Sequence, residues 1–320
     1  MIDIIIPWVD GADAEWRKSK AAYSPGTAAM NGGNRFRDMN AMRYWFRAVE
    51  KYAPWVNKIF FVTAGHLPDF LNLSHPKLVR VKHSDYIPAE FLPTFNSNAI
   101  ELNFHRIESL SERFILFNDD TFLNRPTTPE DFFADGLPRA LGVLNATSPY
   151  NDFMYIQFNN TYVINRHFKQ RENQKHYFSP KYGKELARNL FFRNYPVYPG
   201  FLEKHIVIPH LKSVWNEVWE REGAVLSETS GNKFRTRADV SHLLFKNWYV
   251  ASGRFAPQSA GFGRYYNLSD YRQYKPDIAN AKSKVVCVND ESPDANFELD
   301  LGGLLSLLDK KFPEKSSFEL

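Results

Sequence analysis

The chain has 320 residues, 43% hydrophobic and 16% aromatic, so it is long enough to bury a full globular core. Its 40 Lys and Arg nearly balance 36 Asp and Glu, and the formal charge of +4 argues against nucleic acid as a partner while allowing a local basic phosphate site. The single cysteine, Cys287, excludes an intramolecular disulfide and any zinc or iron–sulfur site built from cysteines, and favours a reducing compartment.

The first part of the chain alternates predicted strands and helices. Residues 2–9 are a short, β-branched run that ends at the turn signal Asp10-Gly11, which predicts a buried strand. This run is too short for a signal sequence or a membrane span, so we expect a cytoplasmic protein with at most peripheral membrane association. Residues 38–52 place apolar side chains on one helical face. A second helix is predicted at 96–110, and further strands at 58–63, 78–82 and 113–117.

Strands that alternate with helices predict an α/β fold with a largely parallel sheet, in which ligands bind beyond the carboxyl ends of the strands. After residue 140 the pattern becomes mostly helical. Helices are predicted at 160–168, 181–190, 210–222 and 301–308, with a late strand at 285–288. We therefore expect one domain over 1–320, with an α/β core at 1–140 and a mostly helical half at 141–320 that packs over it.

Acidic side chains follow the predicted strands at three places. These are Asp10, the pair Asp119-Asp120, and Asn289-Asp290. Magnesium prefers hard oxygen ligands and binds one or two carboxylates together with substrate phosphates, so the pattern is compatible with a magnesium-bound nucleotide. An isolated Asp-Asp pair after a strand is more often a turn or a helix cap.

Basic and histidine residues supply the complementary chemistry. Arg35 and Arg37 precede the first predicted helix, and a guanidinium donates two parallel hydrogen bonds to phosphate. A histidine near a phosphate is a candidate general base. His205 and His210 are five residues apart with a proline between them, which does not predict a zinc site. The chain lacks the phosphate-binding loop, dinucleotide fingerprint and nucleophile elbow of other enzyme classes.

Several segments in order resemble the Stealth family of capsular polysaccharide phosphotransferases, which is similar to the catalytic subunit of the lysosomal N-acetylglucosamine-1-phosphotransferase. The resemblance begins with IDIIIPWVDGAD at 2–13. It is most specific over about ninety residues, in NRFRD at 34–38, VEKYAPWV at 49–56, IFFVTAG at 59–65, LPTFNSNAIE at 92–101, HRI at 105–107, LSERF at 110–114 and NDD at 118–120. Weaker matches are PH at 209–210, FRTRAD at 234–239, CVND at 287–290 and FPEKSS at 312–317.

The resemblance implies a Rossmann-like, GT-A-like nucleotide-sugar sheet and transfer of a hexose-1-phosphate from a UDP-sugar to a hydroxyl of a glycan or lipid-linked glycan. It implies Mg²⁺ or Mn²⁺ at Asp119 and Asp120, catalytic roles for Asp120, His210 and Arg237, and a reaction at the inner face of the membrane. His210 would be the acceptor base and Arg237 would stabilise the phosphoryl charge, although Arg235 is an alternative. The substrate-binding residues would be Asp10, Gly11, Arg35, Arg37, Thr94, Asn96, Ser97, Asn98, Glu101, His105, Asn118 and Asp239.

Other functions remain open from the sequence. A conventional glycosyltransferase on a similar fold would break the sugar C1–O bond and release UDP instead of UMP. A non-catalytic glycan-binding or assembly subunit would turn over nothing, but it would not need the acidic, histidine and arginine set. A lysosomal-targeting phosphotransferase is disfavoured by the short, cysteine-poor chain.

Overall fold

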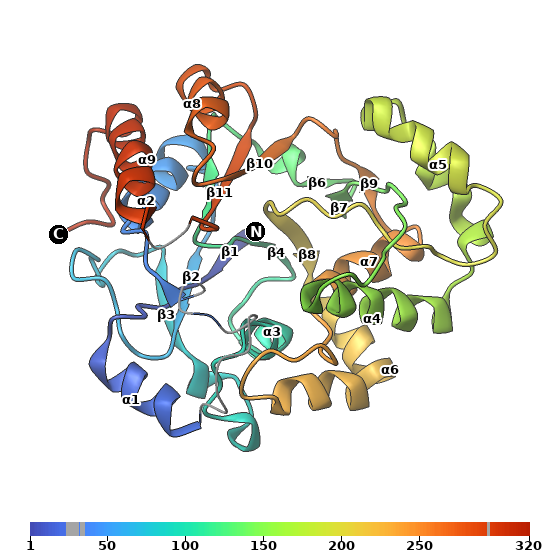
Figure 1. The fold of residues 1–320 in the computed structure, drawn as a ribbon, viewed down its shortest axis with the longest axis horizontal. Helices are drawn as coiled ribbons and strands as arrows, with labels where there is room; N and C mark the ends of the chain where they lie inside the picture. The colour runs from blue at the N-terminus through green and yellow to red at the C-terminus, as the bar shows by residue number, and fades with distance from the viewer. Residues whose placement is uncertain (24–31, 33–35, 293–294) are drawn as a thin grey trace.

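The computed structural model describes residues 1–23, 32, 36–292 and 295–320. Its central sheet has the strand order β3-β2-β1-β4-β8 (Figure 1). The buried strand β1 lies in the middle and pairs in parallel with β2 and β4, and β3 extends the parallel set. The last strand, β8, is antiparallel to β4. The bounds are β1 Ile2–Pro7, β2 Ile59–Thr63, β3 Leu78–Lys82, β4 Arg113–Leu116 and β8 Ile208–Leu211.

Two smaller three-stranded sheets complete the strand structure. One has the order β10-β11-β5 and the other β6-β7-β9. Their bounds are β5 Thr121–Leu123, β6 Phe133–Ala134, β7 Leu137–Ala140, β9 Ala256–Pro257, β10 Gly263–Asn267 and β11 Val285–Asn289. Because β5 follows β4 after only four residues and pairs with β11, it brings Cys287 beside the end of β4.

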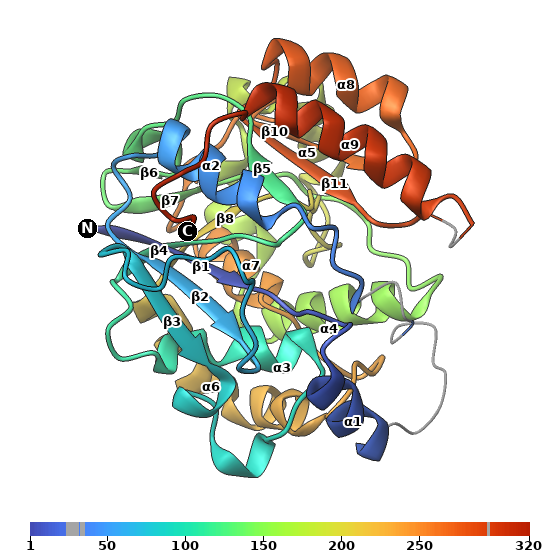
Figure 2. The ribbon, with the colours of Figure 1, turned by 90° about the vertical axis from the view of Figure 1, so that its left-hand side faces the viewer.

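Helices cover both faces of the central sheet, as Figure 2 shows, with α2, α8 and α9 on one side and α3 and α6 on the other. Alternation along β1 explains the two layers: Ile4 and Ile6 face one core and Ile5 faces the other. Among the helices that the structure describes, none combines the length and the hydropathy of a membrane-spanning segment. The helices are α1 Ala14–Tyr23, α2 Met42–Tyr52, α3 Ser97–Leu102, α4 Asp152–His167, α5 Leu186–Phe192, α6 Lys212–Gly231, α7 Leu243–Ala251, α8 Tyr271–Asn280 and α9 Phe297–Lys311.

The predicted α/β class with a parallel sheet is confirmed. The strands predicted from β-branched runs are present within a residue or two, but the helix predicted at 96–110 ends at residue 102 and continues as a 3-10 turn at Phe104–Arg106. The helix predicted at 210–222 is wrong at its start. His210 belongs to β8, because the β-branched residues before it favour an extended chain, and α6 begins at Lys212.

Candidate active site

Four carboxylates gather where β1 and β4 end, and we call them the carboxylate cluster: Asp10, Asp38, Asp119 and Asp120. The parallel pairing of β1 and β4 brings their carboxyl ends to the same edge of the sheet. Asp38 is held there by the indole of Trp8, whose Nε1 donates to Oδ1 at 3.5 Å. The cluster therefore forms at the edge where α/β sheets bind ligands.

The members of the carboxylate cluster repel one another. Burial, and then the charges of Asp120 and Asp38, raise the pKa of Asp119 to about 7. Burial is also the main cause of the raised pKa of Asp38, with Asp10 adding to it. A pair of adjacent carboxyl groups that cannot both ionise easily is an environment that a bound cation stabilises.

Asp120 also contacts a histidine and the single cysteine. Nε2 of His205 lies 3.3 Å from Oδ2 of Asp120 and 3.0 Å from Nδ2 of Asn118. The thiol of Cys287 donates to Oδ2 of Asp120 at 3.3 Å. Burial would raise the pKa of Asp120, but His205, Cys287 and Thr121 lower it below its usual value.

Asp120, His205 and Cys287 form the one group of the described residues whose ligand atoms, all within 4.8 Å of one another, could hold a metal ion. The single thiol, Cys287, thus belongs to a candidate metal group, which the cysteine count alone did not predict. Burial, reinforced by Asp120, raises the pKa of Cys287 well above its usual value, so the thiol stays protonated as a donor. Carboxylate oxygens are the hard ligands that Mg²⁺ and Mn²⁺ prefer, and Asp120 supplies one to this group.

Asp10 and Gly11 form the turn that follows β1. The backbone N–H of Asp10 donates to Nε2 of His66 at 2.9 Å, and its own Oδ1 accepts from the N–H of Ala12 at 2.7 Å. A Cβ on Gly11 would lie 1.9 Å from the carbonyl oxygen of Phe36, so only glycine permits this close approach. Both residues thus stand at the strand-end edge, and their contact with substrate stays a prediction.

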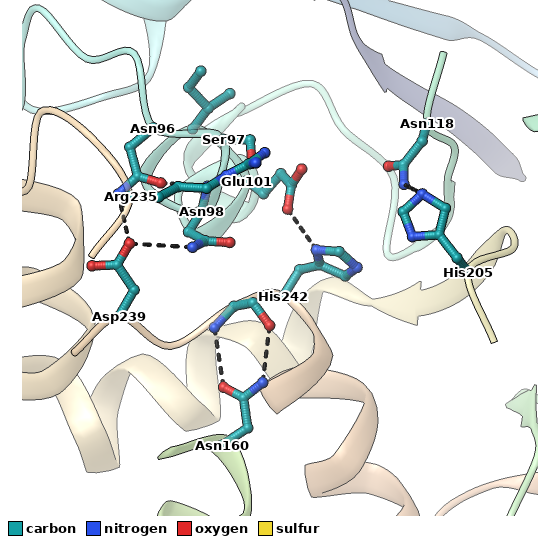
Figure 3. Close-up of polar contacts among 12 residues, drawn as sticks. Asn96, Ser97, Asn98, Glu101, Asn118, Asn160, His205, Arg235, Asp239 and His242 are labelled. Carbon is teal, nitrogen blue, oxygen red and sulfur yellow. Dashed lines mark hydrogen bonds and ion pairs between the residues drawn. The ribbon is translucent and has the colours of Figure 1, made fainter. Parts of the chain in front are cut away.

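A second polar group, which we call the Asp239 network, is fully hydrogen-bonded (Figure 3). The buried carboxylate of Asp239 accepts from Nδ2 of Asn96 at 2.8 Å, Asn98 at 3.2 Å and Asn232 at 2.8 Å. It also accepts from the backbone N–H and hydroxyl of Thr236. The network joins the 94–98 loop to the 232–239 loop. It gives the three asparagines, Asn96, Asn98 and Asn232, a common acceptor in Asp239.

The two arginines beside this network have different surroundings. Arg235 donates to the hydroxyl of Ser97 at 3.1 Å from Nε and 2.5 Å from Nη2, on the first turn of α3. Arg237 is exposed, with Nη2 2.9 Å from Asp152, and its guanidinium lies over the ring of Tyr155. Arg235 therefore contacts the predicted substrate loop. Arg237, in the same 232–239 loop, instead contacts side chains of the N-terminal turn of α4.

In Figure 3 a carboxylate–imidazole pair, Glu101 and His242, lies between the Asp239 network and the pair Asn118–His205. Oε2 of the buried Glu101 is 2.5 Å from Nδ1 of His242. Glu101 is near enough to His205 to contribute to the raised pKa of that histidine, which burial opposes and Asp120 chiefly causes. Nε2 of His242 has no hydrogen-bond partner in the described part of the chain. A histidine oriented in this way by a carboxylate is the arrangement of a general base.

Two predicted histidines lie away from the strand ends. His210 is fully buried on β8, stacked on Phe114 and edge-on to Trp215, and neither ring nitrogen has a partner among the described residues. Burial holds its pKa well below the usual value. The ring is enclosed in the core and has no exposed surface, so this geometry favours another residue as the base. His105 packs against Trp215 and Trp219 of α6.

The remaining predicted residues fall into place as follows. Arg37 makes a two-pronged ion pair with Asp290, at 2.8 and 2.9 Å, which ties the first half of the chain to the end of β11. Thr94 is buried and accepts from the N–H of Asn96 at 3.3 Å. Arg35 lies outside the described residues.

Sequence reasoning missed two candidates, His205 and His242. No local pattern identifies either, because their partners Asn118 and Glu101 are 87 and 141 residues away. A usable signal was the position of His242 three residues after the FRTRAD segment at 234–239, in which the resemblance places predicted site residues.

Comparison with known families matches two models. Residues 2–28 match the Stealth protein conserved region 1, and residues 35–140 match conserved region 2. These ranges hold β1, the carboxylate cluster and the 94–98 loop.

Curated relatives match over nearly the whole length. A capsular polysaccharide phosphotransferase WcwK of Streptococcus pneumoniae is 43% identical, covering 99% of this chain and 98% of its own. An exopolysaccharide phosphotransferase cps2G of Lactiplantibacillus plantarum is 38% identical, covering 99% and 96%. A receptor polysaccharide phosphotransferase WefC of Streptococcus gordonii is 38% identical, covering 100% and 99%. Among solved structures, the galactosyltransferase LgtC is similar with a TM-score of 0.44 and 9% identity, covering 99% and 98%.

Proposed function

The chain belongs to the Stealth family of polysaccharide phosphotransferases, and we propose that it transfers N-acetylhexosamine-1-phosphate from a UDP-sugar to a hydroxyl of a bacterial surface glycan. As a member of this family it is a phosphotransferase of polysaccharide synthesis. The donor, the release of UMP, a lipid-linked form of the acceptor and a site of action at the inner membrane face are parts of the proposal.

One observation supports the proposal above all. The structure contains both a cluster of carboxylates that repel one another and a histidine, His242, that Glu101 orients. Asp119 and Asp120 would hold Mg²⁺ or Mn²⁺ against the donor diphosphate, with Asn118 and Asp10 beside it. The ion, when bound, neutralises charge on the phosphate oxygens. These residues suit a divalent cation, because burial and the neighbouring carboxylates raise the pKa of Asp119 to about 7 and a bound cation would offset that repulsion.

The chain's own residues perform the remaining steps of the proposed reaction. Nε2 of His242, oriented by Glu101, takes the proton of the acceptor hydroxyl as that oxygen attacks the sugar-linked phosphorus. The P–O bond to the nucleoside phosphate breaks, and UMP leaves with the bridging oxygen. Arg235, held by Ser97, offsets the negative charge that spreads over the phosphoryl oxygens.

This assignment moves the base from His210 to His242 and favours Arg235 over Arg237. His242 has one free ring nitrogen beside a carboxylate, whereas both nitrogens of His210 are enclosed by aromatic rings. Arg235 contacts the 94–98 loop, whereas Arg237 is paired with Asp152 at the protein surface.

The released nucleotide tests the chemistry directly. The purified protein is incubated with UDP-N-acetylglucosamine, Mg²⁺ and an acceptor oligosaccharide, and the nucleotide is identified by chromatography. UMP together with a phosphodiester in the product supports the proposal. Release of UDP would assign a conventional glycosyltransferase, and no release with any UDP-sugar would favour a glycan-binding subunit.

A further inference from the structure

The positive charge of the chain is concentrated in one stretch. Residues 166–195 contain eight Lys and Arg and two Glu, a net charge of +6, whereas the whole chain carries +4. The rest of the molecule therefore has a net charge of −2. All eight basic side chains are exposed, so this region presents an electropositive surface.

Exposed apolar side chains concentrate in the same region. Sixteen large apolar residues are exposed in the described part of the chain, and ten of them lie between residues 150 and 197. Five of these, which with the basic residues of 166–195 we call the aromatic–basic surface, are Tyr162, Leu190, Phe191, Tyr195 and Val197. Phe191 is 79% exposed. Single exposed apolar side chains are common on protein surfaces, but a group of them in one region is typical of an interaction site.

Hydrogen bonds hold the two halves of this surface together. Asn165, at the end of α4, donates to the carbonyl of Tyr198 at 2.9 Å, and Gln170 donates to the carbonyl of Phe192 at 2.9 Å. The segments around Tyr162 and Phe191 are therefore neighbours. Figure 1 shows α4 and α5 on the side of the molecule away from α8 and α9.

The solvent face of α4 continues the surface toward the active site. Tyr155, Phe158 and Tyr162 are spaced as i, i+3 and i+7, so they share one face of the helix, and all three are exposed. An ordinary surface helix would place polar residues there. At the other end of this face the guanidinium of Arg237 lies over the ring of Tyr155, 5.3 Å from its centroid.

We propose that the aromatic–basic surface binds peripherally to an anionic lipid bilayer. Lys and Arg attract anionic headgroups, and Tyr and Phe are favoured at the depth of the headgroups. A protein partner would not require a net charge of +6 on a stretch of a chain whose remainder carries −2, whereas an anionic membrane is complementary to that charge. The surface would also bring the active site to a lipid-linked acceptor, a consequence that rests on the proposed function.

Vesicle co-sedimentation of the full-length protein tests the proposal. Binding is expected to vesicles of phosphatidylcholine mixed with phosphatidylglycerol, not to phosphatidylcholine alone, and it should weaken as salt rises. The double variants Leu190→Ser/Phe191→Ser and Arg188→Glu/Arg193→Glu should each lower the affinity at least about tenfold. Matched controls lie on α9: Leu299→Ser, at a side chain that is also 79% exposed, and Lys310→Glu should bind like the wild type.

Three results would overturn the proposal. These are no vesicle binding by the wild type, equal binding by either double variant, or a dimer in solution that Leu190→Ser/Phe191→Ser dissociates, which would assign the surface to a second copy. Nucleotide release with a water-soluble acceptor is measured in parallel. That reaction should be unchanged in the surface variants, so a failure of membrane binding is distinguishable from a failure of the proposed transfer.

Discussion

The carboxylate cluster, which is partly buried, and the Asp239 network, whose carboxylate is fully buried, differ in how their charge is satisfied. Asp239 accepts hydrogen bonds from three amide side chains and from Thr236. Asp119 instead faces other carboxylates, which together with burial raise its pKa to about 7. A buried carboxylate whose oxygens all accept hydrogen bonds contributes to the stability of the fold. A carboxylate that faces other carboxylates is a candidate for binding a cation.

The two regions also divide the chain between them. The carboxylate cluster comes entirely from the first 120 residues: Asp10, Asp119 and Asp120 follow strands, and Asp38 lies in the loop before α2. The Asp239 network joins the 94–98 loop to the 232–239 loop, so it needs the second half of the chain. Function should therefore be lost without loss of stability in the first region, and both should be lost together in the second.

The strongest test of this difference is Asp119→Asn. We expect turnover to fall about 10³-fold, because a charge that would hold the cation is removed. The metal-free protein should become more stable at neutral pH. The native carboxyl keeps its proton to about pH 7 and the unfolded one loses it near pH 4, so wild-type stability declines over that interval and the amide removes the decline.

Thermal unfolding at pH 5 and pH 8 with nucleotide-release kinetics measures both effects. Asp135→Asn is the matched control, because Asp135 is an exposed turn residue with a positive φ of 52° that asparagine also adopts. If Asp119→Asn lowered stability and activity in parallel, the cluster would be structural.

The next largest effect is expected for His242→Gln. Loss of a general base should lower kcat about 10²-fold or more, with little change in the KM for the donor. Glu101→Gln should change the pH–rate profile and lower kcat less, because Glu101 positions the histidine without touching the acceptor. His176→Gln, at a histidine that lies against Phe255, is the control. An unchanged kcat in folded His242→Gln would remove it from the mechanism.

Asp239→Asn should mainly affect folding. The amide replaces an acceptor of several buried hydrogen bonds with a group that also donates, so at least one asparagine of the network loses its partner. We expect a loss of about 3 kcal/mol in the free energy of unfolding. Urea unfolding compares it with Asp135→Asn. A variant as stable as the wild type, with activity alone reduced, would show that Asp239 acts on the substrate.

The strand ends could be predicted from sequence because they depend on local patterns. Ile4, Ile5 and Ile6 form a β-branched run that is closed by Asp10-Gly11, and Phe114, Ile115 and Leu116 are followed by Asn118. A run of this kind followed by a turn signal predicts a strand from local sequence alone. Because parallel strands end at the same edge of the sheet, the carboxylates that follow these runs are predicted to lie there together.

The histidines could not be assigned in the same way. His205 and His242 reach the site only through long-range contacts with Asn118 and Glu101. His210 follows a β-branched run and a proline, and its strand register opposite Phe114 turns it into the core. A strand period of two decides which face a side chain takes, and the sequence alone does not give the register between β4 and β8.

The smallest change in activity is expected for His210→Phe, which also tests that register. The ring packs among Phe114, Trp215 and Tyr249, so a phenyl group should fit, and turnover should stay within about threefold of the wild type.

Burial holds the pKa of His210 far below its usual value, so the native ring stays neutral while the unfolded one takes up a proton below about pH 6.5. The free energy of unfolding of the wild type therefore falls with decreasing pH, by up to about 1.4 kcal/mol per pH unit from this group. Urea unfolding at pH 7 and pH 5 should show a smaller fall in His210→Phe, with His83 and His105, whose pKa values burial lowers to about 4 and about 3, accounting for the remainder. A hundredfold loss of turnover in the folded variant would instead place the His210 ring in the reaction.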